Sequence, residues 1–244
     1  MPGLGLLVWL ALVYYCVYIS FHNTALLRHA STSLRTPAKH VFFLKTHKTG
    51  STTLYSILAE FCRGEHLFPL MPRGMHINLF YPKLVAHMLQ LYPGVDKYDM
   101  VFNHQIFDPK IYDYLHNDTF SFTIIRKPKE NFISSFNYWS QIGGWQYLVD
   151  IPGPDKLLQY FLNPNKYEPK DPFFSFTNNR QSLDLGFDIR NHNFNDTNYT
   201  KKFIANLDNY FDIVLIFEYF DESLILLNWQ CRTFFFVLTV SVNL

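Results

Sequence analysis

The sequence predicts an α/β fold with a central parallel sheet, because strand-like apolar runs alternate with helix-like segments along the chain. The apolar run at 41–44 is followed by apolar residues at helical spacing over 54–61. The run at 120–126 is followed in the same way by 128–141, and a further strand is predicted at 210–217. This alternation favours parallel strands flanked by helices, with ligands bound at the carboxyl ends of the strands. A short helix is predicted over 83–91, and residues 163–200, rich in Asn, Asp and Pro, are predicted to lie at the surface over the site.

Residues 1–22 form an apolar N-terminal segment, which we predict to be a signal-anchor transmembrane helix. The stretch Leu4–Phe21 has no charged residue and approaches the roughly 20 residues that span a bilayer. A cleaved signal peptide is the alternative, but the segment lacks a basic n-region and a small-residue cleavage site. Residues 23–39 are polar and are predicted to form a stem, so that the catalytic domain covers 40–227.

The composition is that of one domain with a small appendage, since the chain has 244 residues and a net charge of +1. It provides no global basic field for nucleic acid, because the positive charge is local, at 45–48 and 126–129. The cysteines Cys16, Cys62 and Cys231 are too scattered for a disulfide framework or a zinc site, although a Cys62–Cys231 bridge stays open. No metal-ligand cluster is evident, so we expect no metal.

The segment after the strand at 41–44 has the composition of an anion-binding loop. Gly50 allows close approach of the backbone, and the helix that follows presents backbone N–H groups and a partial positive charge. Lys45 and Lys48 add cations, but they precede Gly50, so the loop is not a Walker A motif. The simpler alternative is a strand, a turn and a helix with solvated lysines. Hydroxyl donors are supplied by Thr49, Ser51, Thr52 and Thr53.

A second anion-binding signal lies where the strand at 120–126 ends in Arg126. The Arg guanidinium fits phosphate geometry, and Ser134 lies about two turns into the next helix, so we expect both side chains to hold one phosphate. Tyr138 and Trp139 are candidates for stacking on a base or a sugar. Phe136 is a weaker candidate, because core packing of the helix explains it as well.

These two signals resemble the 5′-phosphosulfate loop and the 3′-phosphate-binding strand and helix of Golgi sulfotransferases. The order Lys-Thr-His-Lys-Thr at 45–49, with Ser-Ser-Phe-x-Tyr at 134–138, resembles the galactose-3-O-sulfotransferase family. The resemblance covers about 40–227. Further segments that fit the family are 102–104, 178–179, 183–188, 211–216 and 218–224.

The resemblance implies a P-loop-like sulfotransferase fold and transfer of a sulfuryl group from 3′-phosphoadenosine 5′-phosphosulfate (PAPS). The implied acceptor is the 3-hydroxyl of galactose in galactosylceramide or in a related glycolipid or glycan, and the chemistry requires no metal. Lys45 would lie at the oxygen that bridges phosphate and sulfate. The expected donor-binding residues are Lys45, Thr46, Lys48, Thr49, Gly50, Ser51, Thr52, Thr53, Arg126 and Ser134.

A sugar hydroxyl is a weak nucleophile, so the reaction needs a general base, and a neutral histidine suits this near pH 7. The candidates are His47 in the loop and His104 at the end of the strand predicted at 99–104, and we favour His104 slightly. Asn178 and Asn179 are candidates for binding acceptor hydroxyls, with a simple turn as the alternative. Carboxylates that stay open as alternative bases are Asp108, Glu130 and Glu218.

The resemblance also implies a type II Golgi membrane protein with a lumenal catalytic domain, anchored by its N-terminal helix. Three glycosylation sequons, at Asn117, Asn195 and Asn198, agree with a lumenal location. Basic residues that follow the apolar segment favour the opposite orientation. A homo-oligomer stays open, because the sequence sets no oligomeric state.

Residues 228–244 form an atypical tail, because the family's domain continues beyond this point with a different sequence. The chain therefore resembles a C-terminally truncated member of the family. This leaves a second hypothesis, a non-catalytic relative that retains nucleotide binding. A third, a nucleotide kinase with a variant phosphate loop, is disfavoured because the Gly-Lys-Ser/Thr order is missing.

Overall fold

The structure, a computed structural model, describes residues 38–74, 78–80, 88–141 and 146–231. The predicted signal anchor at 1–22 therefore lies outside the described residues, as do most of the stem and of the tail. Within the described ranges, no helix combines the length and the apolar character that a membrane span requires.

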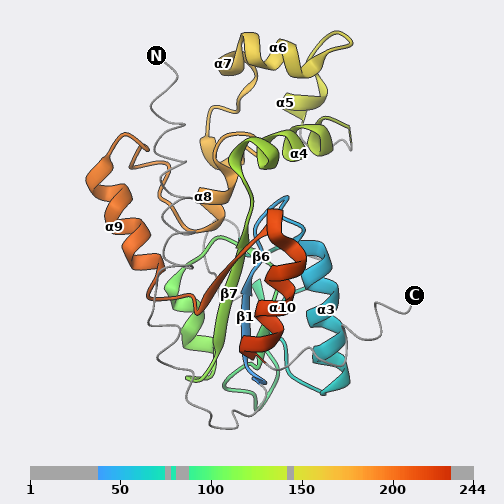
Figure 1. Ribbon diagram of the computed structural model, residues 1–244, viewed down its shortest axis with the longest axis vertical. Coiled ribbons are helices and arrows are strands. Elements are labelled where there is room, and N and C mark those ends of the chain that lie inside the picture. The colour runs from blue at the N-terminus through green and yellow to red at the C-terminus, as the bar shows by residue number, and fades with distance from the viewer. Residues whose placement is uncertain (1–37, 75–77, 81–87, 142–145, 232–244) are drawn as a thin grey trace.

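A four-stranded parallel sheet forms the centre of the molecule, as predicted, in the order β5-β1-β7-β8 (Figure 1). Val41 lies opposite Met100 on one side and Phe120 on the other, and Phe122 lies opposite Ile213. All four strands therefore point their carboxyl ends to the same edge. Their bounds are β1 (Val41–Leu44), β5 (Met100–Val101), β7 (Phe120–Ile125) and β8 (Ile213–Ile216).

Alternate side chains of β1 build the two halves of the core, because successive strand residues point to opposite faces. Val41 and Phe43 pack against helices α3 (Ser51–Gly64) and α10 (Phe220–Cys231). Phe42 and Leu44 pack on the other face, against the 3₁₀ helix η2 (Pro109–Tyr114) and the region that follows helix α9 (Thr197–Leu207). All four side chains are fully buried, so the apolar run at 41–44 has no polar face.

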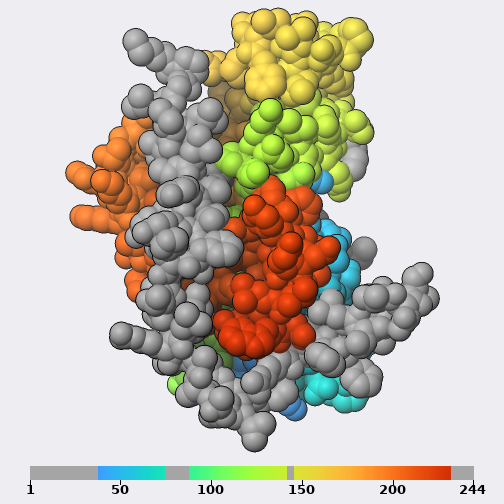
Figure 2. Space-filling view, in the orientation of Figure 1, coloured from blue at the N-terminus to red at the C-terminus, as the bar shows by residue number. Residues whose placement is uncertain are grey.

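Helix α4 (Pro128–Gln141) begins where β7 ends and carries a separate layer beyond the carboxyl edge of the sheet (Figure 1). Its Phe136 packs in a core of its own with Leu148, Ile151 and Tyr160, so the simpler interpretation of Phe136 is confirmed. Figure 2 shows α4 above α10 on one face of the molecule, with the segment after α4 at the top. The helices of this segment are α5 (Gln146–Val149), α6 (Lys156–Leu162) and α7 (Pro164–Tyr167).

Several predicted elements differ from the structure where long-range pairing overrides the local pattern. The prediction of a helix over 83–91 is wrong for its last residues, because β4 (Leu89–Gln90) pairs antiparallel with β2 (Met71–Pro72). The strand expected over 99–104 is split, since β6 (His104–Gln105) pairs with β3 (Asn78–Phe80) in another sheet.

The C-terminal part of the described chain also differs from expectation. Helix α10 continues to Cys231, so the boundary expected after Leu227 lies inside this helix. Ala38 donates a backbone hydrogen bond to the carbonyl of Cys231, at 2.9 Å. Cys62 and Cys231 are both buried as free thiols, so the bridge that the sequence left open does not form in the structure.

Candidate functional site

The loop after β1 is fixed by its own hydroxyl groups. Thr46 Oγ1 donates to the carbonyl of Ile124 at 2.5 Å, and Ser51 Oγ donates to the carbonyl of Thr46 at 2.7 Å. Thr49 Oγ1 lies 2.9 Å from Thr46 Oγ1. The hydroxyl groups of Thr46 and Thr49 therefore stabilise the conformation of the loop, and Thr46 connects the loop to the end of the neighbouring strand β7.

Gly50 is the residue before α3, and its backbone is left-handed, with φ at +71°. A Cβ here would lie 2.6 Å from Cε2 of Phe217, so a larger residue would force this ring to shift. No side chain caps the first turn of α3, which leaves its N–H groups to face the loop. The absence of a side chain at Gly50 thus leaves room for the ring of Phe217, and the close approach of an anion to this backbone stays a prediction.

We expect Gly50→Ala to lower the free energy of unfolding by about 1–2 kcal/mol from its left-handed backbone alone, and by more because of the contact with Phe217. Gly64→Ala at the end of the same helix is the matched control, since a Cβ there meets nothing within 4 Å. Urea denaturation of both variants measures the difference. Equal stability of the two variants would contradict the tight packing at Gly50.

A cavity of about 500 Å³ opens at the carboxyl edge of the sheet, and it brings together most of the predicted donor-binding residues. Thr46 and Thr53 do not line it: Thr46 is fully buried in the loop, and Thr53 lies exposed on α3. Three cations but no carboxylate line the cavity among the described residues. The lining residues are Lys45, His47, Lys48, Thr49, Gly50, Ser51, Thr52, His104, Arg126, Ser134, Tyr138, Trp139 and Phe176.

Lys45 is the most buried of these cations, at 7% exposure. Its Nζ donates to Ser51 Oγ at 3.1 Å. Burial lowers the pKa of Lys45 to about 8, with the charge of Lys48 acting in the same direction and Asp184 opposing it. Because burial makes its charge unfavourable, Lys45 is stabilised more strongly by an anionic ligand than a solvated lysine would be.

Lys48 and Arg126 complete the positive wall. Lys48 Nζ lies 3.7 Å from the ring centroid of Tyr138, and its pKa is lowered by burial and then by the charge of Arg126. Arg126 stacks over Phe217 at 4.4 Å and donates from Nη1 to the carbonyl of Lys48 at 3.3 Å. Arg126 Nε is buried with no hydrogen-bond partner among the described residues, which is a position for a ligand oxygen.

The two candidate histidines lie face to face, with ring centroids 3.9 Å apart and an angle of 13° between the planes. His104 Nδ1 lies 2.9 Å from the carbonyl oxygen of Lys45. Because a carbonyl only accepts, Nδ1 carries the proton and Nε2 of His104 carries a lone pair. Burial, then the charges of His47 and Lys45, lower the pKa of His104 well below its usual value, so the ring is neutral at pH 7.

His47 is held by Asp184, a residue to which the sequence assigned no role. Asp184 Oδ2 accepts from the backbone N–H of His47 at 2.8 Å and lies 2.9 Å from His47 Nδ1. Arg180 Nε donates to the other oxygen at 3.0 Å. Asp184 is fully buried; burial raises its pKa, but His47 and Arg180 outweigh this, so the pKa is lowered and the carboxylate stays charged.

We expect Asp184→Asn to reduce the free energy of unfolding by about 3–5 kcal/mol, because it leaves the buried Arg180 without its counter-charge. The matched control is Asp171→Asn, which removes the partner of the exposed Arg190 and should cost less than about 1 kcal/mol. Chemical denaturation at neutral pH measures both. Similar losses in the two variants would show that the buried pair contributes no special stability.

Two further residues that the sequence did not single out also fix the site. Gln181 accepts from the backbone N–H of Arg126 at 2.8 Å and donates to its carbonyl at 2.9 Å. Asn131 on α4 donates to the carbonyl of His47 at 2.8 Å. Gln181 lies with Arg180 and Asp184 on the short helix α8 (Arg180–Asp184), which is buried throughout, so the prediction that 163–200 lies at the surface is wrong for this helix.

The predicted acceptor residues lie outside the main cavity. Asn178 is exposed, and Asn179 lines a second cavity of about 280 Å³ between α4, α6 and the segment before α8. Phe176 lines both cavities, so the two are neighbours. The alternative bases Asp108 and Glu218 cap backbone N–H groups, of Lys110 and Lys127, and none of the three carboxylates lines the main cavity.

The expectation of no metal stays a prediction, but three side chains that could hold a metal ion lie together in the structure. The structure brings His40, Asp99 and His116 together at the opposite edge of the sheet. No local spacing in the sequence indicates this group, because its members precede three different strands. The three predicted glycosylation sites, Asn117, Asn195 and Asn198, are all exposed.

Comparison with known proteins gives one consistent family. A family model described as galactose-3-O-sulfotransferase matches residues 3–236, a range that extends past Leu227. Galactose-3-O-sulfotransferase 2 of Mus musculus is 31% identical over 204 residues, which cover 80% of this chain and 50% of that protein. Galactosylceramide sulfotransferase of Homo sapiens is 30% identical over 194 residues, covering 78% of this chain and 45% of that protein.

A third relative, galactose-3-O-sulfotransferase 3 of Mus musculus, is 34% identical over 197 residues, covering 78% and 44% of the two chains. The chain thus spans about half the length of the curated relatives that it matches. No solved structure gives a significant match.

Proposed function

Because the chain belongs to the galactose-3-O-sulfotransferase family, we propose that it uses PAPS to sulfate the 3-hydroxyl of galactose in galactosylceramide or a related glycolipid or glycan. The observation that carries this proposal is the convergence of Lys45, Lys48 and Arg126 on one cavity without a lining carboxylate. A donor with anionic groups at both ends of its ribose needs such a site.

The donor would be held at two places. Arg126, with its unpartnered Nε, and Ser134 on α4 suit the 3′-phosphate. Lys48 and the N–H groups at the start of α3 suit the 5′-phosphate, which Gly50 allows to come close to the backbone. Lys45 would stabilise the negative charge that develops on the phosphate oxygen as the sulfate leaves.

The proton of the attacking hydroxyl needs an acceptor, and His104 is the base we propose. The oxygen–sulfur bond to galactose forms while the sulfur–oxygen bond to the 5′-phosphate breaks, and the hydroxyl proton passes to Nε2 of His104. The neutral ring with its lone pair on Nε2, fixed by the bond from Nδ1 to the Lys45 carbonyl, supports this role. His47, which is hydrogen-bonded to Asp184, instead stacks on the ring of His104 and helps to position it.

Acceptor binding is proposed next to this site. The smaller cavity, which Asn179 lines and which adjoins the main cavity at Phe176, lies where a galactose could be presented to His104. Asn178 lies beside it. We further propose a Golgi membrane protein with a lumenal catalytic domain, which the exposed sequon residues Asn117, Asn195 and Asn198 support.

The test has two arms on the same purified full chain. Calorimetry should show binding of adenosine 3′,5′-bisphosphate but not of ATP, and labelled PAPS should sulfate galactosylceramide or a β-galactoside. Binding without transfer to either acceptor would favour the alternative, a non-catalytic relative that retains nucleotide binding. A folded chain that does not bind the bisphosphate would overturn the proposal.

Nucleotide binding should depend on pH through Lys45. Its pKa of about 8 in the free protein means that the charged fraction falls roughly tenfold between pH 7 and pH 9. Affinity for adenosine 3′,5′-bisphosphate should fall by about tenfold from pH 7 to pH 9, with proton uptake on binding. Calorimetry in buffers of different ionisation enthalpy measures both, and Lys45→Arg should flatten the profile.

A further inference from the structure

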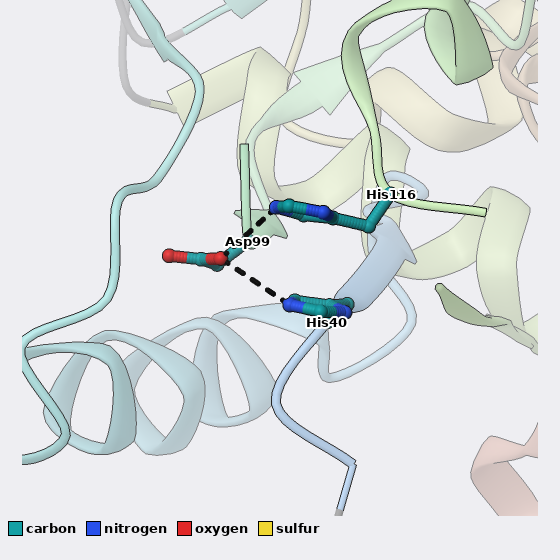
Figure 3. A group of neighbouring side chains, drawn as sticks. All are labelled: His40, Asp99 and His116. Carbon is teal, nitrogen blue, oxygen red and sulfur yellow. Dashed lines mark ion pairs between the residues drawn. The ribbon is translucent and has the colours of Figure 1, made fainter. Parts of the chain in front are cut away.

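A second cluster of titratable side chains lies at the amino edge of the sheet, away from the proposed donor site. His40 immediately precedes β1, Asp99 immediately precedes β5, and His116 lies shortly before β7. Since β5, β1 and β7 are parallel neighbours, the residues in front of them meet at one edge. Figure 3 shows both imidazole rings, stacked one above the other, directed at the carboxylate of Asp99.

The distances in this cluster suit ligands that share an ion. Asp99 Oδ1 lies 3.5 Å from His40 Nε2 and 3.3 Å from His116 Nε2, and the three candidate ligand atoms lie within 4.8 Å of one another. These separations are long for direct hydrogen bonds. Two tetrahedral zinc ligands, each about 2.0–2.2 Å from the metal, are roughly 3.4 Å apart.

The surroundings orient two of the three ligands. Asp118 Oδ1 lies 2.6 Å from His40 Nδ1, so Nδ1 donates to Asp118 and Nε2 is directed at Asp99. Asp99 Oδ2 accepts from the backbone N–H of Phe68 at 2.7 Å, which directs Oδ1 at the two rings. Each Nε2 atom that faces the Asp99 carboxylate therefore needs either a proton or a metal ion between the two atoms.

We propose that His40, Asp99 and His116 bind a divalent cation of the zinc type, with Asp118 as the carboxylate that orients His40. Two imidazoles and one carboxylate form a donor set that zinc takes in proteins, with a further position for water. Hydrogen bonding of a ligating histidine to a second carboxylate is the usual supporting arrangement. The ion would hold together the amino ends of three adjacent strands.

The burial of the group fits this role. The side chains of His40, His116 and Asp99 are 24%, 35% and 16% exposed, so an ion can enter from solvent and is then partly shielded. Asp118, at 76%, stays at the surface. His40 and Lys45 flank opposite ends of β1, so the ion would act on stability and not on sulfuryl transfer.

The experiment uses the full chain without a histidine tag, stripped with a chelator and titrated with Zn²⁺. We expect calorimetry and elemental analysis to show that each chain binds one Zn²⁺ ion tightly. A hundredfold excess over Kd should raise Tm by roughly 5–10 °C. Co²⁺ in place of zinc should give the visible absorption of a tetrahedral site. His116→Ala should abolish all three signals.

Two more variants separate a built site from general histidine binding. Asp118→Asn should keep the stoichiometry and weaken Zn²⁺ binding by about 10–100-fold. His192→Ala, which removes the half-buried histidine paired with Asp196, should leave zinc binding unchanged. The proposal is overturned if the wild-type chain does not bind one Zn²⁺ ion tightly. It is also overturned if His116→Ala binds Zn²⁺ as tightly as the wild type. Should His116→Ala not fold, the cobalt spectrum and the affinity of Asp118→Asn decide the matter.

Discussion

His104→Asn is expected to lower kcat for sulfuryl transfer by about 10²–10⁴-fold, the range for loss of a positioned general base. Asparagine places an amide N–H near the position of Nδ1, so the hydrogen bond to the Lys45 carbonyl is kept. What is lost is the lone pair on Nε2. Steady-state kinetics with PAPS and galactosylceramide measure the effect, while the Kd for adenosine 3′,5′-bisphosphate should change less than about threefold.

His47→Asn is the comparison that decides between the stacked histidines. Because Asp184 clamps His47, this variant should lose stability and some positioning of His104, and so retain more activity than His104→Asn once its folded fraction is matched. The reverse order, with His104→Asn active and His47→Asn inactive, would assign the base to His47. The pH profile of kcat gives a second readout, since loss of the base removes its acidic limb.

Lys45→Met is expected to reduce kcat by about 10²–10³-fold, because it removes the cation beside the leaving oxygen and keeps the length and apolar packing of the stem. Burial already makes the charge on Lys45 costly in the free protein, as its pKa of about 8 indicates. Much of the favourable interaction is therefore realised only when negative charge develops next to it.

Lys48→Met is the matched control for this prediction. Lys48 lies at the rim of the same cavity, over Tyr138, and should contribute to donor binding, so its loss should raise KM for PAPS more than it lowers kcat. Single-turnover measurements separate the two effects. If both variants lose kcat equally, Lys45 has no special position at the leaving group.

The fold and much of the candidate site could be predicted because their signals are local. Apolar runs of four to six residues, the glycine before α3 and the basic residues at strand ends act over one strand or one helical turn. Parallel strands bring their carboxyl ends to one edge, so Lys45, His104 and Arg126 were expected to meet, and they line one cavity. Thr46 did not reach the cavity, since its hydroxyl bonds instead to β7.

The remaining features depend on contacts between distant segments. Asp184 holds His47 although 137 positions separate them, and Gln181 pairs with Arg126 across 55. Leu89–Gln90 became a strand because Met71–Pro72 was available to pair with it. No pattern along the chain encodes such partners.

The sequence alone thus determined the parallel α/β sheet, the loop between β1 and α3 and most of the residues that line the cavity there, because periodicity and loop chemistry are properties of neighbouring residues. Only the tertiary structure decided that the rings of His47 and His104 stack, that Asp184 holds His47, and that His40, Asp99 and His116 meet. Those outcomes depend on burial and on the register between strands, and both arise only when the chain packs.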